Sequence, residues 1–338
     1  MPPLESVWFV LIGVLLAGYT ILDGFDLGAG MLHLFVARSD AERRQVINSV
    51  GPVWDGNEVW LLTGGGALFA AFPKVYATVF SGLYLALMLL LAALILRAVC
   101  LEFRSKLAGP GWRSTWDAIF AVSSFLPSLL FGVAVGNILR GLPLDQEQEF
   151  AGSFVGLLNP FALVVGLMSV AMFLVQGSAW LNLKTEGAVC DRARAWAKGS
   201  WLAFIALWIV ATIVSRVGLP QLWRAFAHPV AWLVPVVFVA SAAGFRALIG
   251  SRRPGVAFLL SSVAIAALWG IAGLGLYPNL VPALVGGESL TVTNACSSPL
   301  ALRVMFVVAL IGMPFVIGYT IFIYSCFKGP VKLDEHSY

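Results

Sequence analysis

The chain has 338 residues, of which 60% are hydrophobic and only 11% are charged, and its formal net charge is +4. Soluble globular proteins carry about 25% charged residues, so this composition excludes a soluble body, a disordered chain and a disulfide scaffold, and it indicates a protein surrounded by lipid. The small positive excess forms no basic stripe, which excludes a nucleic-acid-binding protein.

Apolar segments long enough to cross a bilayer recur along the whole chain. A helix needs about 20 apolar residues to cross a hydrocarbon core about 30 Å thick. The first segment lacks the basic start and the small-residue cleavage site of a signal peptide, so we interpret it as a retained span. The second segment is the most polar, with acids in its first turns and three glycines in its middle. The predicted spans are residues 7–36, 51–72, 75–96, 115–139, 159–183, 199–215, 229–245, 256–277 and 302–327.

Lysine and arginine alternate between rich and poor loops along these nine spans. The loops after the first, third, fifth and seventh spans and the tail hold most of the 21 basic residues, and we place Arg97 and Arg104 in the second of these rich loops. The positive-inside rule then puts the N-terminus outside and the C-terminus in the cytoplasm. We therefore predict an all-α polytopic integral membrane protein, with about nine transmembrane helices in a single membrane domain, residues 1–338.

Four acids within or at the ends of the first two spans are candidate functional residues. Asp23 and Asp26 lie deep in the first span, and Asp55 and Glu58 begin the second. Each pair has a spacing of three residues, which places both carboxylates on one helix face. The topology puts all four near the cytoplasmic side of neighbouring antiparallel helices. A charge inside a bilayer costs roughly 3 kcal/mol or more, so these acids suit a proton-uptake path.

Structural roles for the same acids stay open. They would pair with Arg38, Arg43 or Arg44, or Asp55 and Glu58 would stabilise a helix N-terminus. Asp117, at the start of the fourth span, is a third place where an acid meets the membrane.

Glycines suggest how the first span packs. Gly24 and Gly28 surround Asp26, and such small residues favour close helix approach. They are also compatible with a helix broken around a substrate, so a stand-alone secondary transporter is the alternative function.

The residues that could bind a cofactor are few. A haem needs axial ligands, commonly His or Met, and only His33 of the three histidines lies within a predicted span, His228 and His336 lying in a loop and in the tail. Two-histidine ligation of a haem in this chain is therefore excluded. The four cysteines form no CxxC pair, and we predict neither a metal nor a disulfide role for them.

Several stretches match the motifs of one known family. They are LDGFDLGAGML, RRQVINSVGPVWDGNEVWLLTGGGALFAAFPKVYA, FSGLYLALMLLLAALILRAV, LEFRSK, LPSLLFGVAVGN, LLNPFALVVGLMSVAMFLVQGSAWL and the final HSY. On these stretches, which span almost the whole chain, the protein resembles subunit II of cytochrome bd-type quinol oxidases. The block WDGNEVWL is the most specific part of the match, and the loop between the sixth and seventh spans matches least.

The resemblance implies a subunit of a respiratory complex in the bacterial cytoplasmic (inner) membrane. The complex would oxidise quinol, such as ubiquinol, and reduce dioxygen to water with protons taken from the cytoplasm. Subunit I would hold the b-type and d-type haems and the quinol site, so no catalytic residue is expected in this chain. The resemblance also implies that this chain contacts membrane lipid, and it allows a structural quinone bound to this chain and small single-span accessory subunits in the complex. Asp26 and Asp55 match acids of the family's proton route, and Asp23 and Glu58 match neighbouring motif positions.

Overall fold

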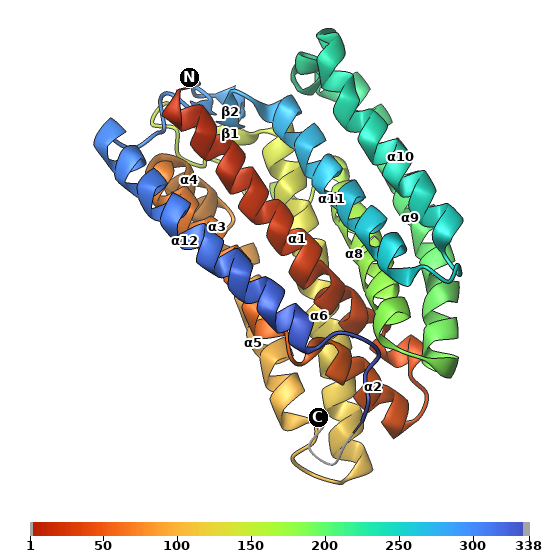
Figure 1. Cartoon of the computed structure of the whole chain (residues 1–338). Coiled ribbons are helices and arrows are strands. Elements are labelled where there is room, and N and C mark those ends of the chain that lie inside the picture. The colour runs from red at the N-terminus through yellow and green to blue at the C-terminus, as the bar shows by residue number, and fades with distance from the viewer. Residues whose placement is uncertain (1–2, 334–338) are drawn as a thin grey trace.

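The computed structural model describes residues 3–333, and these form a bundle of long helices (Figure 1). The helices are α1 (Leu4–Val36), α2 (Asp40–Val50), α3 (Trp54–Ala71), α4 (Pro73–Gly82), α5 (Tyr84–Phe103), α6 (Pro110–Arg140), α7 (Phe154–Leu157), α8 (Pro160–Lys184), α9 (Gly187–Gly218), α10 (Leu233–Leu248), α11 (Pro254–Leu276) and α12 (Pro299–Cys326). Three 3₁₀ helices, η1 (Pro220–Trp223), η2 (Ala225–Ala227) and η3 (Pro229–Trp232), join α9 to α10. The predicted all-α fold is confirmed.

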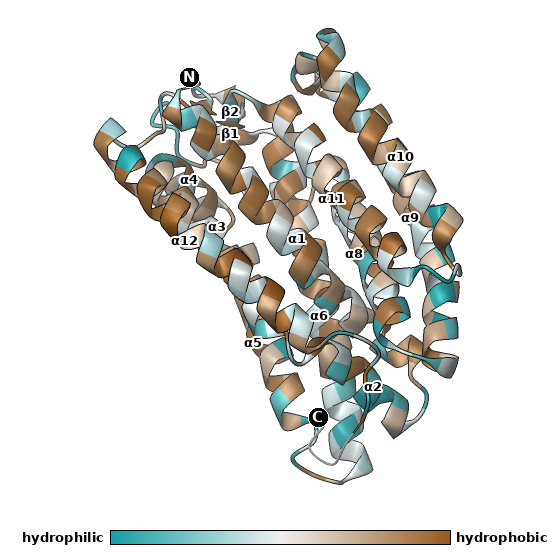
Figure 2. Ribbon diagram, viewed as in Figure 1, coloured by the Kyte–Doolittle hydropathy of each residue, from teal (hydrophilic) through white to brown (hydrophobic). Residues whose placement is uncertain are grey.

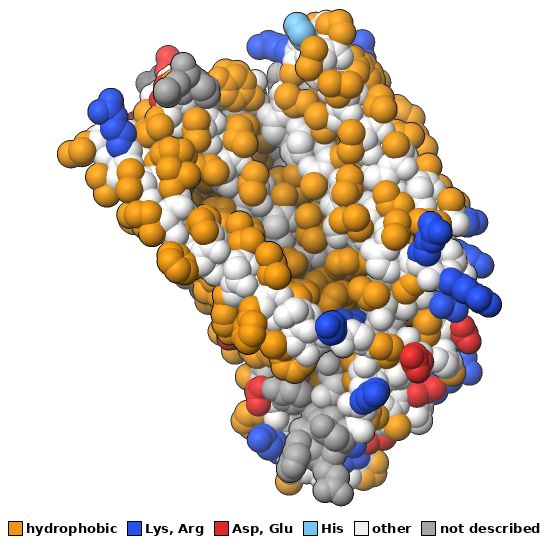
Figure 3. Space-filling view, in the orientation of Figure 1, with side chains coloured by type: hydrophobic (Ala, Val, Ile, Leu, Met, Phe, Trp, Pro, Cys, Tyr) orange, Lys and Arg blue, Asp and Glu red, His pale blue; other side chains and the backbone are white. Residues whose placement is uncertain are grey.

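The long helices carry the apolar surface that a membrane requires. Within residues 3–333, eight helical segments are long and apolar enough to cross a membrane, namely α1, α5, α6, α8, α9, α11, α12 and the segment Pro229–Leu248 that contains α10. Hydrophobic residues cover the length of these helices, whereas hydrophilic residues gather toward the end of the bundle where α2 lies (Figures 2 and 3). The chain is therefore a multi-pass membrane protein.

The remaining predicted span, residues 51–72, corresponds to α3. Its polar first turns and its glycines leave it outside the eight segments that are apolar enough to cross a membrane. At one end of α3, Asn57 contacts Tyr324 near the end of α12, and at the other Ala71 accepts a hydrogen bond from Ser297, just before α12. The helix α3 thus runs beside nearly all of α12, and α1 begins at the end of the bundle opposite to where α12 ends (Figure 1). That α3 crosses the membrane as the ninth span stays a prediction.

The third predicted span lies further along the chain than the apolar pattern suggested. After α3 the chain forms the short helix α4, which begins at Pro73, and the membrane-length helix α5 begins only at Tyr84. Because α5 then continues to Phe103, Arg97 lies inside this helix with 1% of its surface exposed. The expected place of Arg97 in a basic loop is therefore wrong.

Helix α1 packs closely against α8 through glycines. A Cβ atom built on Gly28 would lie 2.0 Å from the carbonyl oxygen of Phe173, and one on Gly177 would lie 2.3 Å from the carbonyl carbon of Gly28. The backbones touch there because neither residue has a side chain. Close packing of the glycines around Asp26 is confirmed, and α1 is continuous rather than broken.

Short strands close the end of the bundle where α1 begins. The strands are β1 (Leu142–Leu144), β2 (Asn279–Val281), β3 (Ala283–Gly286) and β4 (Leu290–Thr291), with β1 parallel to β3 and β2 antiparallel to β4. They join the two polar loops that follow α6 and α11. Their buried side chains pack with Trp8, Ile12 and Phe72.

Candidate functional site

Arg97 of α5 is the centre of a buried charge cluster formed by three helices. Its Nη2 atom donates to Asp23 Oδ1 of α1 at 2.6 Å and to Glu58 Oε1 of α3 at 2.5 Å. The side chain of Asp23 is fully buried, and that of Glu58 is 24% exposed. One guanidinium therefore brings together carboxylates from the two spans in which the sequence placed them.

Asp26, one turn along α1 from Asp23, is held by an amide. Its Oδ2 atom accepts a hydrogen bond from Asn57 Nδ2 at 2.8 Å, and the same amide nitrogen lies 3.4 Å from the carbonyl oxygen of Leu22. The Oδ1 atom of Asn57 accepts a hydrogen bond from the hydroxyl of Tyr324 at 2.8 Å. Asp26 is thus linked through α3 to the last helix, α12.

The cluster contains more acids than bases. Asp23, Asp26 and Glu58 surround the one cation Arg97, and their combined charge is costly to bury in a membrane bundle. Asp23 Oδ2 and Asp26 Oδ1 are buried and have no hydrogen-bond partner among the described residues. Buried polar atoms are ordinarily hydrogen-bonded. The arrangement therefore has free acceptor oxygens that can take up a proton, and a bound proton reduces the excess negative charge.

Asp55 differs from the other three predicted acids. It is exposed, one turn before Glu58 in α3, and it forms no hydrogen bond or ion pair with any residue from 3 to 333. The structure therefore brings three of the four acids together in the interior and leaves Asp55 on the surface at the same end of the bundle.

A second cluster explains the arginines near α2. Asp117 of α6 binds three cationic or polar groups: His33 Nε2 at 2.6 Å, Arg104 Nε at 2.6 Å and Arg43 Nη1 at 2.7 Å. Asp40 then binds Arg104 Nη2 at 2.9 Å. Arg43, an alternative partner proposed above for the acids of the first two spans, is therefore used by Asp117.

Each described histidine uses one ring nitrogen in a hydrogen bond within the chain. The Nε2 atom of His33 is occupied by Asp117 and its ring is fully buried, so this nitrogen is not open to iron. His228 lies at the start of η3, where Nδ1 accepts from the backbone of Val230, and His336 lies outside the described residues. In the same part of the chain, no group of three His, Cys, Asp or Glu residues is arranged to hold a metal ion.

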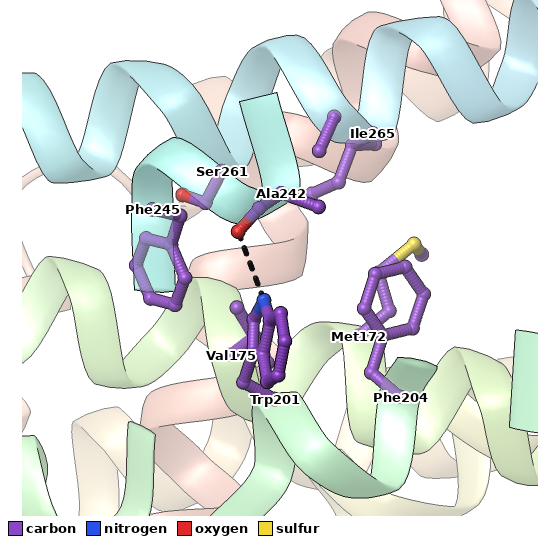
Figure 4. Close-up of a pocket in the computed structure, with 9 residues that line it drawn as sticks. Met172, Val175, Trp201, Phe204, Ala242, Phe245, Ser261 and Ile265 are labelled. Atoms are coloured by element: carbon purple, nitrogen blue, oxygen red, sulfur yellow. Dashed lines mark hydrogen bonds between the residues drawn. The ribbon is translucent and has the colours of Figure 1, made fainter. Parts of the chain in front are cut away.

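A small apolar cavity lies among α8, α9, α10 and α11 (Figure 4). Met172, Phe204 and Phe245 are among the side chains that line it. Its polar groups are already used, since Trp201 Nε1 donates to the carbonyl oxygen of Ala242 and the Ser261 hydroxyl donates to Gln176. The cavity has no titratable lining residue and no free polar group to orient a quinone ring, so the structural quinone stays a prediction.

Sequence reasoning missed three residues of the site. Arg97 carried a signal, because it is a charge within the apolar run LILRAV, and Asn57 lies inside the block WDGNEVW. Tyr324 carried none, because it lies 267 residues from the amide that it contacts.

These features define a class: a multi-pass helical membrane protein with buried carboxylates gathered toward one end of the bundle. The family model for cytochrome bd terminal oxidase subunit II matches residues 4–327. Cytochrome bd-I ubiquinol oxidase subunit 2 of Escherichia coli (strain K12) is 38% identical over 364 aligned residues, covering 98% of this chain and 96% of that protein. Cytochrome bd ubiquinol oxidase subunit 2 of Bacillus subtilis (strain 168) is 34% identical and covers 99% of both chains. The chain therefore belongs to the cytochrome bd terminal oxidase subunit II family.

A solved structure supports the fold. The structure of bd oxidase from Geobacillus thermodenitrificans superposes with a TM-score of 0.79 at 19% sequence identity, covering 96% of this chain and 98% of that chain. The resemblance inferred from the motifs is confirmed, and a stand-alone transporter is not favoured.

Proposed function

We propose that this chain carries protons from the cytoplasm toward a haem-bearing subunit I, as part of an oxidase that couples quinol oxidation to the reduction of dioxygen to water. Asp55 receives the proton at the surface, and Glu58, Asp26 and Asp23 pass it inward around Arg97. The observation that carries the proposal is the buried excess of carboxylates with free acceptor oxygens. Reduction of dioxygen to water consumes protons, so a path from the aqueous side is required.

The surface of α3 supports contact with subunit I. At Gly65 and Gly66, no described atom outside the neighbouring turns of the same helix lies within 4 Å of where a Cβ would be, so another helix can approach closely there. Helix α12, beside α3, exposes apolar side chains along most of its length. We infer that α3 and α12 face the partner subunit, with the haems and the quinol site on the partner's side.

The role of the cluster is tested by neutral substitutions in the intact complex. We expect Asp26→Asn and Asp23→Asn to slow quinol-driven oxygen consumption by about tenfold or more, since a lost proton-transfer group typically costs 10² to 10⁴ in rate. The haem content, measured from the visible spectrum, should stay near wild type. Asp145→Asn is the matched control, because this acid lies in the loop at the opposite end of the bundle.

Two outcomes would contradict the proposal. Wild-type turnover in both variants would show that protons take another route. Loss of the haems in both would show that the acids are needed for assembly rather than for proton transfer.

A further inference from the structure

A hydrogen-bonded chain joins the last helix to the buried carboxylate of Asp26. The Tyr324 hydroxyl donates to Asn57 Oδ1, and Asn57 Nδ2 donates to Asp26 Oδ2, both at 2.8 Å. An amide has one acceptor oxygen and one donor nitrogen. Because Tyr324 occupies the oxygen, the nitrogen of Asn57 is turned toward the carboxylate. We propose that Tyr324 and Asn57 are a positioning pair through which the placement of α12 sets how readily Asp26 gives up its proton. This inference rests on the proton-carrying function proposed above.

The end of α12 is fastened around Tyr324. The Tyr324 ring lies edge-on to Phe25 and to Trp180, with centroid distances of 6.4 and 6.0 Å, and Phe25 and Trp180 stack at 4.0 Å. Lys184 Nζ lies 5.0 Å from the centroid of the Trp180 ring and donates to the carbonyl oxygen of Phe327, just after α12. The tyrosine hydroxyl is therefore directed at Asn57 by packing on α1 and α8.

Along α12, most of the described side chains are exposed or only partly buried. Leu302 is the one residue of α12 that is buried, and its carbonyl oxygen accepts a hydrogen bond from Trp8 at 3.1 Å. Between this contact and Tyr324, side chains such as Val307 and Phe315 are 55% and 75% exposed. A helix held at its two ends can shift when a partner covers its middle, and Tyr324 would transmit that shift to Asn57.

The physical effect on Asp26 has a definite sign. A hydrogen bond donated to a carboxylate favours its ionised form. Asp26 Oδ1 has no hydrogen-bond partner among the described residues, so the hydrogen bond that Asp26 accepts within this part of the chain is the one that Asn57 donates to Oδ2. The charged groups that surround Asp26 are Asp23 of its own helix, Glu58 of α3 and Arg97 of α5, and none of them is bonded to Tyr324. Loss of the tyrosine hydroxyl should therefore let Asp26 keep its proton to higher pH.

The test is Tyr324→Phe in the intact complex, which keeps the ring and its packing and removes only the hydroxyl. The readout is the infrared carbonyl band of protonated Asp26, assigned as the band that Asp26→Asn removes. We expect this band to persist to a pH about 0.5 to 1 unit higher than in the wild type, on the scale of one charged hydrogen bond. Turnover at neutral pH should fall about threefold, with unchanged haem spectra. Tyr84→Phe, at a tyrosine of α5 that is 57% exposed and lies outside the surface formed by α3 and α12, should change neither quantity.

A double-mutant cycle tests whether Tyr324 acts on Asp26 through Asn57. If Tyr324 acts through Asn57, then Asn57→Leu alone and Asn57→Leu with Tyr324→Phe should shift the band equally. Additive shifts, or an unchanged band in Tyr324→Phe, would overturn the positioning pair. Failure of the proton route is a separate result: Asp26→Asn would then turn over normally, while a band shift in Tyr324→Phe would still support the pair.

Discussion

At the scale of single residues, the two charge clusters balance their charges in opposite ways. Arg97 pairs with Asp23 and Glu58, and a third acid, Asp26, lies one turn along α1 from Asp23. Asp117 instead contacts Arg43, Arg104 and the ring of His33. The first cluster has acceptor oxygens to spare, which suits proton transfer. In the second, a fully buried carboxylate is shared among the guanidiniums of Arg43 on α2 and Arg104 at the end of α5 and the ring of His33 on α1. We interpret the second cluster as a structural joint.

Removing the charge of Asp117 should therefore damage assembly rather than rate. Asp117→Asn leaves the buried guanidinium of Arg104 without its main counter-charge, and breaking a buried ion pair costs roughly 3 to 5 kcal/mol. We expect a much lower yield of haem-containing complex and a lower thermal midpoint in detergent. Asp191→Asn is the control, because Asp191 is 73% exposed and pairs with Arg194 at 3.4 Å. Equal stability of the two variants would refute the structural role.

Glu42, on α2 and outside the spans, should make stability depend on pH. The Arg192 guanidinium, whose Nη2 lies 2.6 Å from Oε1, lowers the pKa of this carboxyl below its ordinary value of 4.5, and backbone N–H groups of Arg38 and Ser39 add to the effect. A folded pKa below the unfolded one gives stabilisation that is complete above about pH 4.5 and is lost as the pH falls through the folded value.

The measurement is the thermal midpoint of the complex as the pH is lowered from 6 to 3. Glu42→Gln should lower the midpoint at pH 6 and have little effect at the acid end. Glu147→Gln, at an exposed glutamate of the loop after β1, should follow the wild type throughout. A constant difference between Glu42→Gln and wild type at every pH would contradict the linkage.

At the scale of helices, α1 and α8 pack with their backbones in direct contact. A Cβ on Gly28 would lie 2.0 Å from the backbone oxygen of Phe173 and 2.8 Å from Gly177. These are backbone atoms, so they cannot move aside as the tip of a side chain can. The position of Asp23 and Asp26 relative to α3 depends on this close approach, because both acids lie on the same helix as Gly28.

Gly28→Ala should therefore separate α1 from α8 and destabilise the complex. We expect a clear fall in the thermal midpoint and slower turnover. Gly13→Ala is the matched control on the same helix, since a Cβ there meets no atom within 4 Å. Alanine favours a helix by about 1 kcal/mol over glycine, so this control should be neutral or slightly stabilising. Similar behaviour of the two variants would show that the tight contact is unimportant.

At the scale of the whole molecule, the topology makes a directional prediction. If α3 crosses as the ninth span, the ends of the described chain lie on opposite sides of the membrane, and the positive-inside rule predicts the basic loops in the cytoplasm. Single-cysteine variants test this with a membrane-impermeant thiol reagent applied to intact cells. Glu288→Cys and Lys74→Cys should be labelled from outside, and Lys332→Cys and Arg38→Cys should not; all four positions are exposed in the structure. Matching labelling of positions 38 and 74 would show that α3 does not cross.

The sequence by itself determined the membrane class, the order of the spans and the family, because hydrophobic length and the placement of charge are local properties of the chain. The spacing of Asp23 with Asp26 and of Asp55 with Glu58 was readable for the same reason. The third span was predicted too early in the chain, because a continuous apolar run does not reveal where α4 ends and α5 begins.

Only the tertiary structure decided how those acids are used. The sequence places a residue on a helix but does not determine which neighbour that helix face meets. The sequence therefore did not predict that Arg97 pairs with both Asp23 and Glu58. It also did not predict the hydrogen bond between Tyr324 and Asn57, which are 267 residues apart. Asp55 stayed on the surface although it has the same spacing as its buried counterparts. Burial and partnership depend on helix packing, and packing is a property of the whole bundle.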